Sequence, residues 1–77
     1  MSAASPVAEI RLRDRHHEVF VADTCSIDGP WLYASGRTRI AYGPNWMRER
    51  YLPPKTVTWP RSAVREVRWL NRSAVAA

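Results

Sequence analysis

The sequence has little of what small secreted domains and membrane proteins depend on. Its 77 residues include one cysteine, Cys25, so no internal disulfide can form, whereas a secreted domain of this size usually carries several. No apolar run approaches the ~20 residues of a membrane span. Residues Met1–Pro6 lack the positive cluster and the hydrophobic stretch of a signal peptide. We therefore expect one small domain in the reducing cytoplasm, with no membrane partner.

The chain also lacks a recognisable catalytic or cofactor motif. Its three glycines are spaced by seven residues and each marks a turn, so no glycine-rich phosphate loop is present. His16 and His17 are adjacent, and neighbours on a strand point to opposite faces, so they would chelate a metal poorly. Cys25 has no orienting group that would make it a nucleophile. We expect no enzyme, catalytic residue, metal site, cofactor or small-molecule substrate.

Positive charge is concentrated in the second half of the chain. The net charge is +5, with −2 in residues 1–35 and +7 in residues 36–77. A basic half is typical of a surface that binds an anionic partner. Eleven of the twelve basic residues are Arg and ten residues are Ala. Both types have mostly GC-rich codons, so genome composition is an alternative explanation, although it accounts less well for the asymmetry.

Short alternating segments separated by turn residues predict an all-β fold. The strand-prone segments are residues 9–13, 17–22, 31–34, 38–42, 56–59 and 65–70. Asp28-Gly29 is the clearest turn, and Ser35-Gly36-Arg37 is expected to form another. Residues 48–52 fit either a helical turn or an extended edge strand.

Curling the sheet buries more apolar surface per residue than a flat sheet and leaves fewer open edges. We therefore predict a small five-stranded barrel over residues 8–70. Residues 1–7 are expected to form a flexible arm and residues 71–77 a flexible tail. Pro60 is suited to the start of a short helical turn, which would precede the last strand.

The order of these elements resembles the Sm and Src-homology-3-like small barrels, whose last strand follows a short helical turn. The ending, with Pro60, Val64, Val67 and Trp69, is similar to endings in small orphan proteins of actinobacteria and their bacteriophages. The resemblance implies an SH3-like barrel and a bacteriophage source. The chain shows neither the residues that grip proline-rich peptides nor an RNA-contacting loop of the Sm type, so no functional residue is carried over.

Eight aromatic residues are too many for the interior of so small a barrel. We expect Trp31 and Trp69 to lie in the core. Their expected partners are Ile10, Leu12, Val19, Val21, Ile40 and Val67. Phe20 stands between two valines, so it either points outward or lies where the curling sheet is covered on both faces.

The irregular segment after Gly43 contains the candidate binding surface. We expect Trp46 and Tyr51 to be partly exposed there, or alternatively to cap an open end of the barrel. Trp, Tyr and Arg are enriched at protein-binding hot spots and also stack on single-stranded bases. The candidate partner-binding residues are Trp46, Arg48, Arg50, Tyr51, Arg37 and Arg39. We expect a module that binds a protein partner or self-associates, with nucleic-acid binding by the basic half as the alternative.

Overall fold

The structure, a computed structural model, describes residues 5–70, and nearly all of its regular structure is β-strand. The strands are β1 (Ala8–Leu12), β2 (Glu18–Asp28), β3 (Trp31–Tyr42), β4 (Arg48–Tyr51), β5 (Lys55–Pro60) and β6 (Val64–Trp69). Two single-turn 3-10 helices, η1 (Pro44–Trp46) and η2 (Arg61–Ala63), lie between strands. The predicted all-β class is confirmed. Within the described residues, no helix has the length and apolar character needed to cross a membrane.

The strands form one antiparallel sheet in the order β4–β3–β2–β1–β6, and β5 also pairs with β3. β4 pairs with residues 39–42 and β5 with residues 31–36, so both lie along the same edge of β3. Residues 52–54 separate them and include two prolines, which have no N–H to donate to the ladder. One long edge is therefore divided into two strands. The prediction of five strands is wrong, and the extended alternative for residues 48–52 is the one observed.

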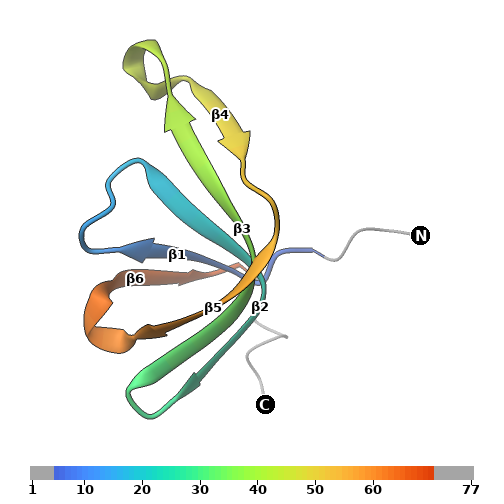
Figure 1. Cartoon of the computed structure of the whole chain (residues 1–77), viewed down its shortest axis with the longest axis vertical. Coiled ribbons are helices and arrows are strands. Elements are labelled where there is room, and N and C mark those ends of the chain that lie inside the picture. Colours follow the sequence, from blue (N-terminus) through green and yellow to red (C-terminus); the bar gives the residue numbers. More distant parts are fainter. Residues whose placement is uncertain (1–4, 71–77) are drawn as a thin grey trace.

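The sheet is curled (Figure 1), and its buried side chains form a small core. The buried cluster consists of Ala8, Ile10, Phe20, Ala22, Leu32 and Ala34. Half-buried side chains from both outer strands pack against it, including Trp59 of β5 and Val67 of β6. No backbone pairing joins β6 to β4 or β5 in the described part of the chain. The predicted closed barrel is therefore wrong: the two ends of the sheet share a core through side chains.

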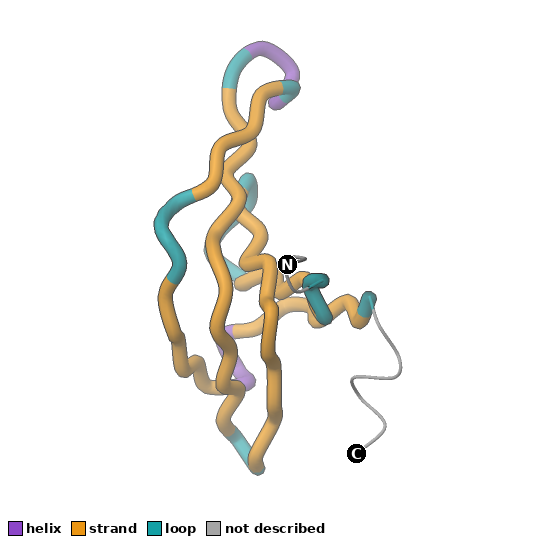
Figure 2. The backbone as a smooth tube through the Cα atoms, turned by 90° about the vertical axis from the view of Figure 1, so that its right-hand side faces the viewer, coloured by secondary structure: helices purple, strands orange, loops and turns teal. Residues whose placement is uncertain are grey.

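The two long hairpins give the molecule its length. The turn between β2 and β3 and the η1 tip between β3 and β4 lie at opposite ends (Figure 2). Asp28 pairs with Trp31, and Gly29 between them has φ +58°, so the predicted Asp-Gly turn is confirmed. η2 follows Pro60 directly and leads into β6, which confirms the predicted helical turn before the last strand.

Alternation along β3 decides which of its side chains are buried. Leu32 is fully buried, whereas Trp31 is 45% exposed. The prediction that Trp31 lies in the core is therefore wrong. The narrow interior accommodates Leu32 and Ala34, and this leaves Trp31 and Tyr33 on the opposite face.

The other core predictions are met in different degrees. Ile10 and Val19 are buried, whereas Trp69 is half-buried against the core. The remaining expected partners, Leu12, Val21, Ile40 and Val67, are also half-buried. Phe20 and Val19 are both buried although they point to opposite faces. The second alternative for Phe20, a position covered on both faces, is thus the one observed.

Gly36 lies inside a continuous strand and not in a turn. The predicted turn at residues 35–37 is wrong, because β3 runs unbroken from Trp31 to Tyr42. Gly36 pairs with Ala22 beside an irregularity in the register of β2. A Cβ at this position would clash with the carbonyl oxygen of Val21 and lie 2.9 Å from the Cα of Ala22. The glycine is needed for a close approach of two strands.

The described part of the predicted arm is joined to the sheet at Val7. Its N–H donates to the carbonyl of Ala22 at 2.8 Å, and its carbonyl accepts from the N–H of Leu70 at 2.9 Å. Residues 1–4 of the arm and the predicted tail at 71–77 lie outside the described residues.

Candidate functional site

Side-chain alternation divides the predicted binding residues between two faces of the sheet. Cross-strand partners point to the same side. Tyr51 pairs with Arg39, on the side facing away from the core, which we call the outer face. Arg50 pairs with Ile40 and Arg48 pairs with Tyr42. These last pairs lie on the side that carries the core, which we call the inner face.

On the outer face, Arg37, Arg39 and Tyr51 come together. The guanidinium carbon of Arg37 lies 5.9 Å from the centroid of the Tyr51 ring, within the range of a cation–π contact. Arg39 forms ion pairs with Glu9 at 3.5 Å and Glu49 at 3.7 Å. The charge of Arg39 is thus compensated, whereas Arg37 has no carboxylate partner among the described residues.

The outer face continues along β3 as a surface of aromatic rings and hydroxyl groups. Trp31 and Tyr33 are 45% and 40% exposed there. The hydroxyl residues beside them, in two cross-strand rows, are Thr24, Ser26, Ser35, Thr56 and Thr58. The hydroxyl oxygens of Thr24 and Ser35 are hydrogen-bonded at 2.6 Å. We call Trp31, Tyr33, Arg37, Tyr51 and these hydroxyl residues the outer patch.

The sequence prediction missed the contribution of Trp31 and Tyr33 to this surface. A usable signal was present, because Trp31 alternates with Leu32 and Tyr33 with Ala34. The smaller pair suits the interior of a small sheet, so the larger pair belongs outside. The long-range neighbourhood of Arg37 and Tyr51 had no comparable local signal.

Trp46 lies apart from the outer patch, at the tip of the β3–β4 hairpin. Its ring stacks on His17, with centroids 3.4 Å apart and planes inclined by 11°. Trp46 is 53% exposed and Tyr51 50%, so their predicted partial exposure is confirmed. Trp46 has φ +57°, a left-handed conformation that is rare for a bulky residue. The stacking contact was missed because it joins two separate loops.

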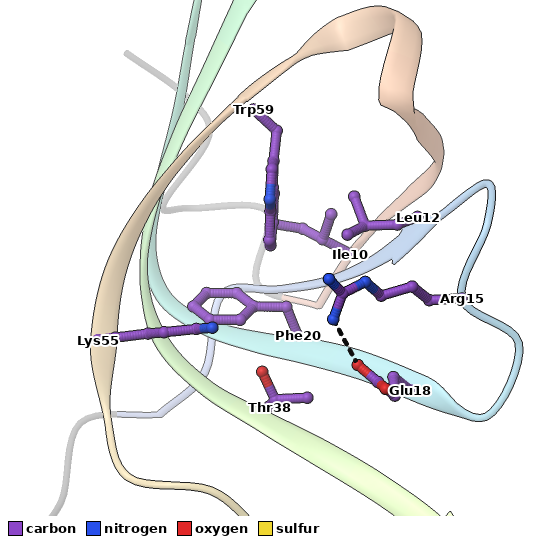
Figure 3. A pocket seen from close by; sticks show the side chains of 8 residues that line it. All are labelled: Ile10, Leu12, Arg15, Glu18, Phe20, Thr38, Lys55 and Trp59. Atoms are coloured by element: carbon purple, nitrogen blue, oxygen red, sulfur yellow. Dashed lines mark hydrogen bonds and ion pairs between the residues drawn. The ribbon is translucent and has the colours of Figure 1, made fainter.

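A small cavity opens on the inner face (Figure 3). It is lined by Ile10, Leu12, Arg15, Glu18, Phe20, Thr38, Lys55 and Trp59. Its volume of about 60 Å³ is far below the ~300–1,000 Å³ of ordinary ligand pockets. Arg15 is paired with Glu18 at 3.2 Å, while the amino group of Lys55 points toward Phe20 and Thr38 (Figure 3). The cavity is too small to enclose a typical organic ligand.

The groups that carry reactive chemistry are scattered in the described residues. No group of three or more His, Cys, Asp or Glu side chains that could hold a metal occurs within residues 5–70. Burial raises the pKa of the Cys25 thiol above its ordinary value, because the desolvated thiolate is disfavoured. Cys25 is thus less reactive than an exposed cysteine.

The comparisons with known proteins assign no family to the chain. The sequence matches no protein-family model, and no curated protein or solved structure matches it. The functional argument therefore depends on the two faces of the sheet.

Proposed function

We propose that the chain is a non-enzymatic protein-binding module whose outer patch binds a second copy of the chain. The observation that supports this is the composition of the outer patch. It combines exposed Trp, Tyr and Arg, the residue types enriched at binding hot spots, with small hydroxyl side chains that give adaptable hydrogen bonding. The rings present large contact areas on a rigid sheet, so binding them orders few flexible groups.

The charge pattern of the outer face favours a second copy over an unrelated partner. The negatively charged Asp28 is the cross-strand partner of Trp31, at one end of the outer patch. The positively charged Arg37 lies near Tyr51, at the other end. The two ends are six residues apart along β3, about 20 Å. A two-fold axis lying across the strands between them places Arg37 of each copy over Asp28 of the other. The patch is thus complementary to itself in that orientation.

The proposal extends to the finer description of the fold and to the location of the chain. An SH3-like arrangement is supported by the position of η2 between β5 and β6 and by the hairpin of β1 and β2 at the start of the sheet. The single cysteine, half-buried and free, suits a reducing cytoplasm. A bacteriophage origin is part of the same proposal and rests on the ending with Pro60, Val64, Val67 and Trp69.

Sedimentation equilibrium between about 5 μM and 1 mM tests self-association. The expected mass rises with concentration to twice the 8.9 kDa of one chain. Trp31→Ala combined with Tyr33→Ala is expected to weaken the dimer by about 30-fold or more, because hot-spot truncations cost on the order of 2 kcal/mol. Trp46→Ala is the matched control, since it removes an equally exposed indole at the far tip and leaves the mass unchanged.

A charge exchange tests the orientation of the two copies. Asp28→Arg and Arg37→Asp should each weaken the dimer, because each places like charges opposite one another. The double variant should restore association, since it exchanges the charges without changing the pattern. A chain that stays monomeric throughout the concentration range would overturn the proposal. A dimer that is insensitive to Trp31 and Tyr33 would place the interface elsewhere.

A further inference from the structure

Three cations without an ion-pair partner among the described residues lie on the inner face, along the edge of β3 that carries β4 and β5. Arg48 and Arg50 project from β4 on this side, and Lys55 of β5 lines the cavity. None of these three cations has an ion-pair partner among residues 5–70. The ion pairs found there involve Arg11, Arg15 and Arg39.

Alternation along β1 and β4 places two carboxylates on the opposite face from these cations. Glu9 and Glu49 lie on the outer face, where both are paired with Arg39. Glu18 lies on the inner face, opposite Ile40, and is paired with Arg15 at 3.2 Å. The inner side of β4 and the cavity mouth therefore present the uncompensated positive charge of Arg48, Arg50 and Lys55.

The spacing of the cations suits a polymer of anions. Arg48 and Arg50 are two residues apart on one side of a strand, about 6.6–6.8 Å, a repeat similar to that of successive phosphates along an extended nucleic-acid strand. Lys55 of β5 lies farther along the same edge of β3, opposite Gly36, whereas Arg50 lies opposite Ile40, so about 13 Å of β3 separates these two positions. A single free phosphate would use only one of these positions, so the row indicates a strand rather than a small anion.

Exposed rings accompany the cations. Tyr42 is the cross-strand partner of Arg48 and is 41% exposed. Trp46, at the tip of the same hairpin, is 53% exposed although one face of its ring is covered by His17. Aromatic side chains beside a basic track bind single-stranded nucleic acids by stacking on the bases. An acidic protein would also satisfy the charges, but the regular spacing of Arg48 and Arg50 with exposed rings beside them favours a nucleic-acid strand.

We propose that the inner face of the β3–β4 hairpin, continued by Lys55 at the cavity mouth, binds single-stranded nucleic acid. Arg48 and Arg50 contact successive phosphates, Lys55 contacts a phosphate farther along the strand, and the Tyr42 ring stacks on a base. This site lies on the opposite side of the sheet from the outer patch. It is therefore independent of the proposed self-association.

Fluorescence anisotropy with a fluorescein-labelled 15-nucleotide oligo(dT) tests the site. Binding is expected at 50 mM NaCl and should weaken toward 200 mM. Three phosphate contacts on a single strand predict a log–log salt slope of about −2. Arg48→Ala and Arg50→Ala should each raise Kd severalfold, for oligo(dT) and oligo(dA) alike, and should each reduce the slope by about 0.7.

Three further variants separate a specific site on the inner face from a general effect of positive charge. Arg68→Ala removes an arginine without an ion pair among residues 5–70 from the outer side of β6, opposite Glu9, so it should leave Kd and the salt slope unchanged. Tyr42→Ala should weaken binding without changing the slope, while Tyr42→Phe should retain it, because stacking requires the ring and not the hydroxyl. Circular dichroism of each variant checks that the sheet is intact.

Three results would contradict the proposal, and they can be distinguished from one another. Absence of binding at 50 mM NaCl overturns the proposal, and so does an effect of Arg68→Ala as large as that of Arg48→Ala. Equal affinity for poly-glutamate, with no effect of Tyr42→Ala, would show a general site for polyanions such as acidic proteins. The double variant Trp31→Ala, Tyr33→Ala should bind oligo(dT) normally, so failure of self-association would leave this result unaffected.

Discussion

At the scale of single residues, position in the strand register matters more than residue type. Arg39 of β3 and Arg50 of β4 belong to adjacent cross-strand pairs. Arg39 points outward, where it forms ion pairs with Glu9 and Glu49. Arg50 points inward and has no carboxylate partner among the described residues. The two side chains have the same chemistry and opposite roles. One stabilises the outer face of the sheet, and the other is available to a ligand.

Gly36 is a residue whose replacement should strongly destabilise the fold. Gly36→Ala is expected to lower the free energy of unfolding by about 3 kcal/mol, because the new methyl group would meet backbone atoms of Val21 and Ala22 that cannot rotate away. Gly29→Ala is the comparison, since its Cβ would meet no atom within 4 Å and only the left-handed backbone costs about 1–2 kcal/mol. Urea unfolding followed by tryptophan fluorescence measures both. Equal losses in the two variants would contradict the close approach at Gly36.

At the scale of elements, η2 is held by contacts from outside it. It has no buried residue and no side-chain cap. Instead, Arg13, just beyond the end of β1, donates from its backbone N–H to Ala63 at 3.0 Å and from its side-chain Nε to the carbonyl of Ser62 at 2.8 Å. This contact fixes the turn that carries the chain from β5 on one side of the sheet to β6 on the other.

Arg13→Ala is expected to destabilise the fold by about 1 kcal/mol, because it removes the side-chain hydrogen bond to η2 and keeps the backbone one. Arg11→Ala is the matched control, two residues earlier within β1. It breaks an ion pair at 3.8 Å with a largely exposed Glu66, which should change stability by no more than about 0.5 kcal/mol. Thermal and urea unfolding of the two variants compare them. A loss in Arg11→Ala as large as in Arg13→Ala would exclude a specific role for the contact with η2.

At the scale of the whole molecule, the open sheet is held in its curled form by side chains. Phe20 of β2 meets Trp59 of β5 edge to face, with ring centroids 5.3 Å apart and planes inclined by 89°. β5 and β2 are not paired strands, so this contact spans the concave side. Together with the half-buried residues of β6, it replaces the backbone pairing that would close a barrel.

A double-mutant cycle of Phe20→Leu and Trp59→Leu should therefore give a coupling energy of about 0.5–1.5 kcal/mol, the contribution of an aromatic pair beyond its buried area. Leucine keeps both sites apolar, which limits the risk of unfolding. The cycle of Phe20→Leu with Trp46→Leu is the control, because Trp46 lies on the distant tip, and it should be additive within about 0.5 kcal/mol. Additivity in both cycles would mean that the Phe20–Trp59 contact does not hold the curl.

The sequence by itself determined the features that depend on neighbouring residues. Alternation and turn residues gave the all-β class, the turn at Asp28-Gly29 and the helical turn after Pro60, because these depend on local backbone preferences. The sequence also indicated that Trp46 and Tyr51 are exposed. It named the arginines of both faces as one group, since residue type alone does not say on which side of a sheet a side chain lies.

Only the tertiary structure decided which side of each strand faces inward, how many strands the edge of β3 carries, and whether the sheet closes. Trp31 and Leu32 fit the alternating pattern equally well, and although the smaller side chain suits a narrow interior, the direction in which the rest of the sheet curls makes the choice. The same choice separates Arg39 and Tyr51 from Arg48 and Arg50. The physical reason is that local backbone preferences do not distinguish the two faces of a strand. Only contacts between segments distant in the chain decide which face becomes the interior.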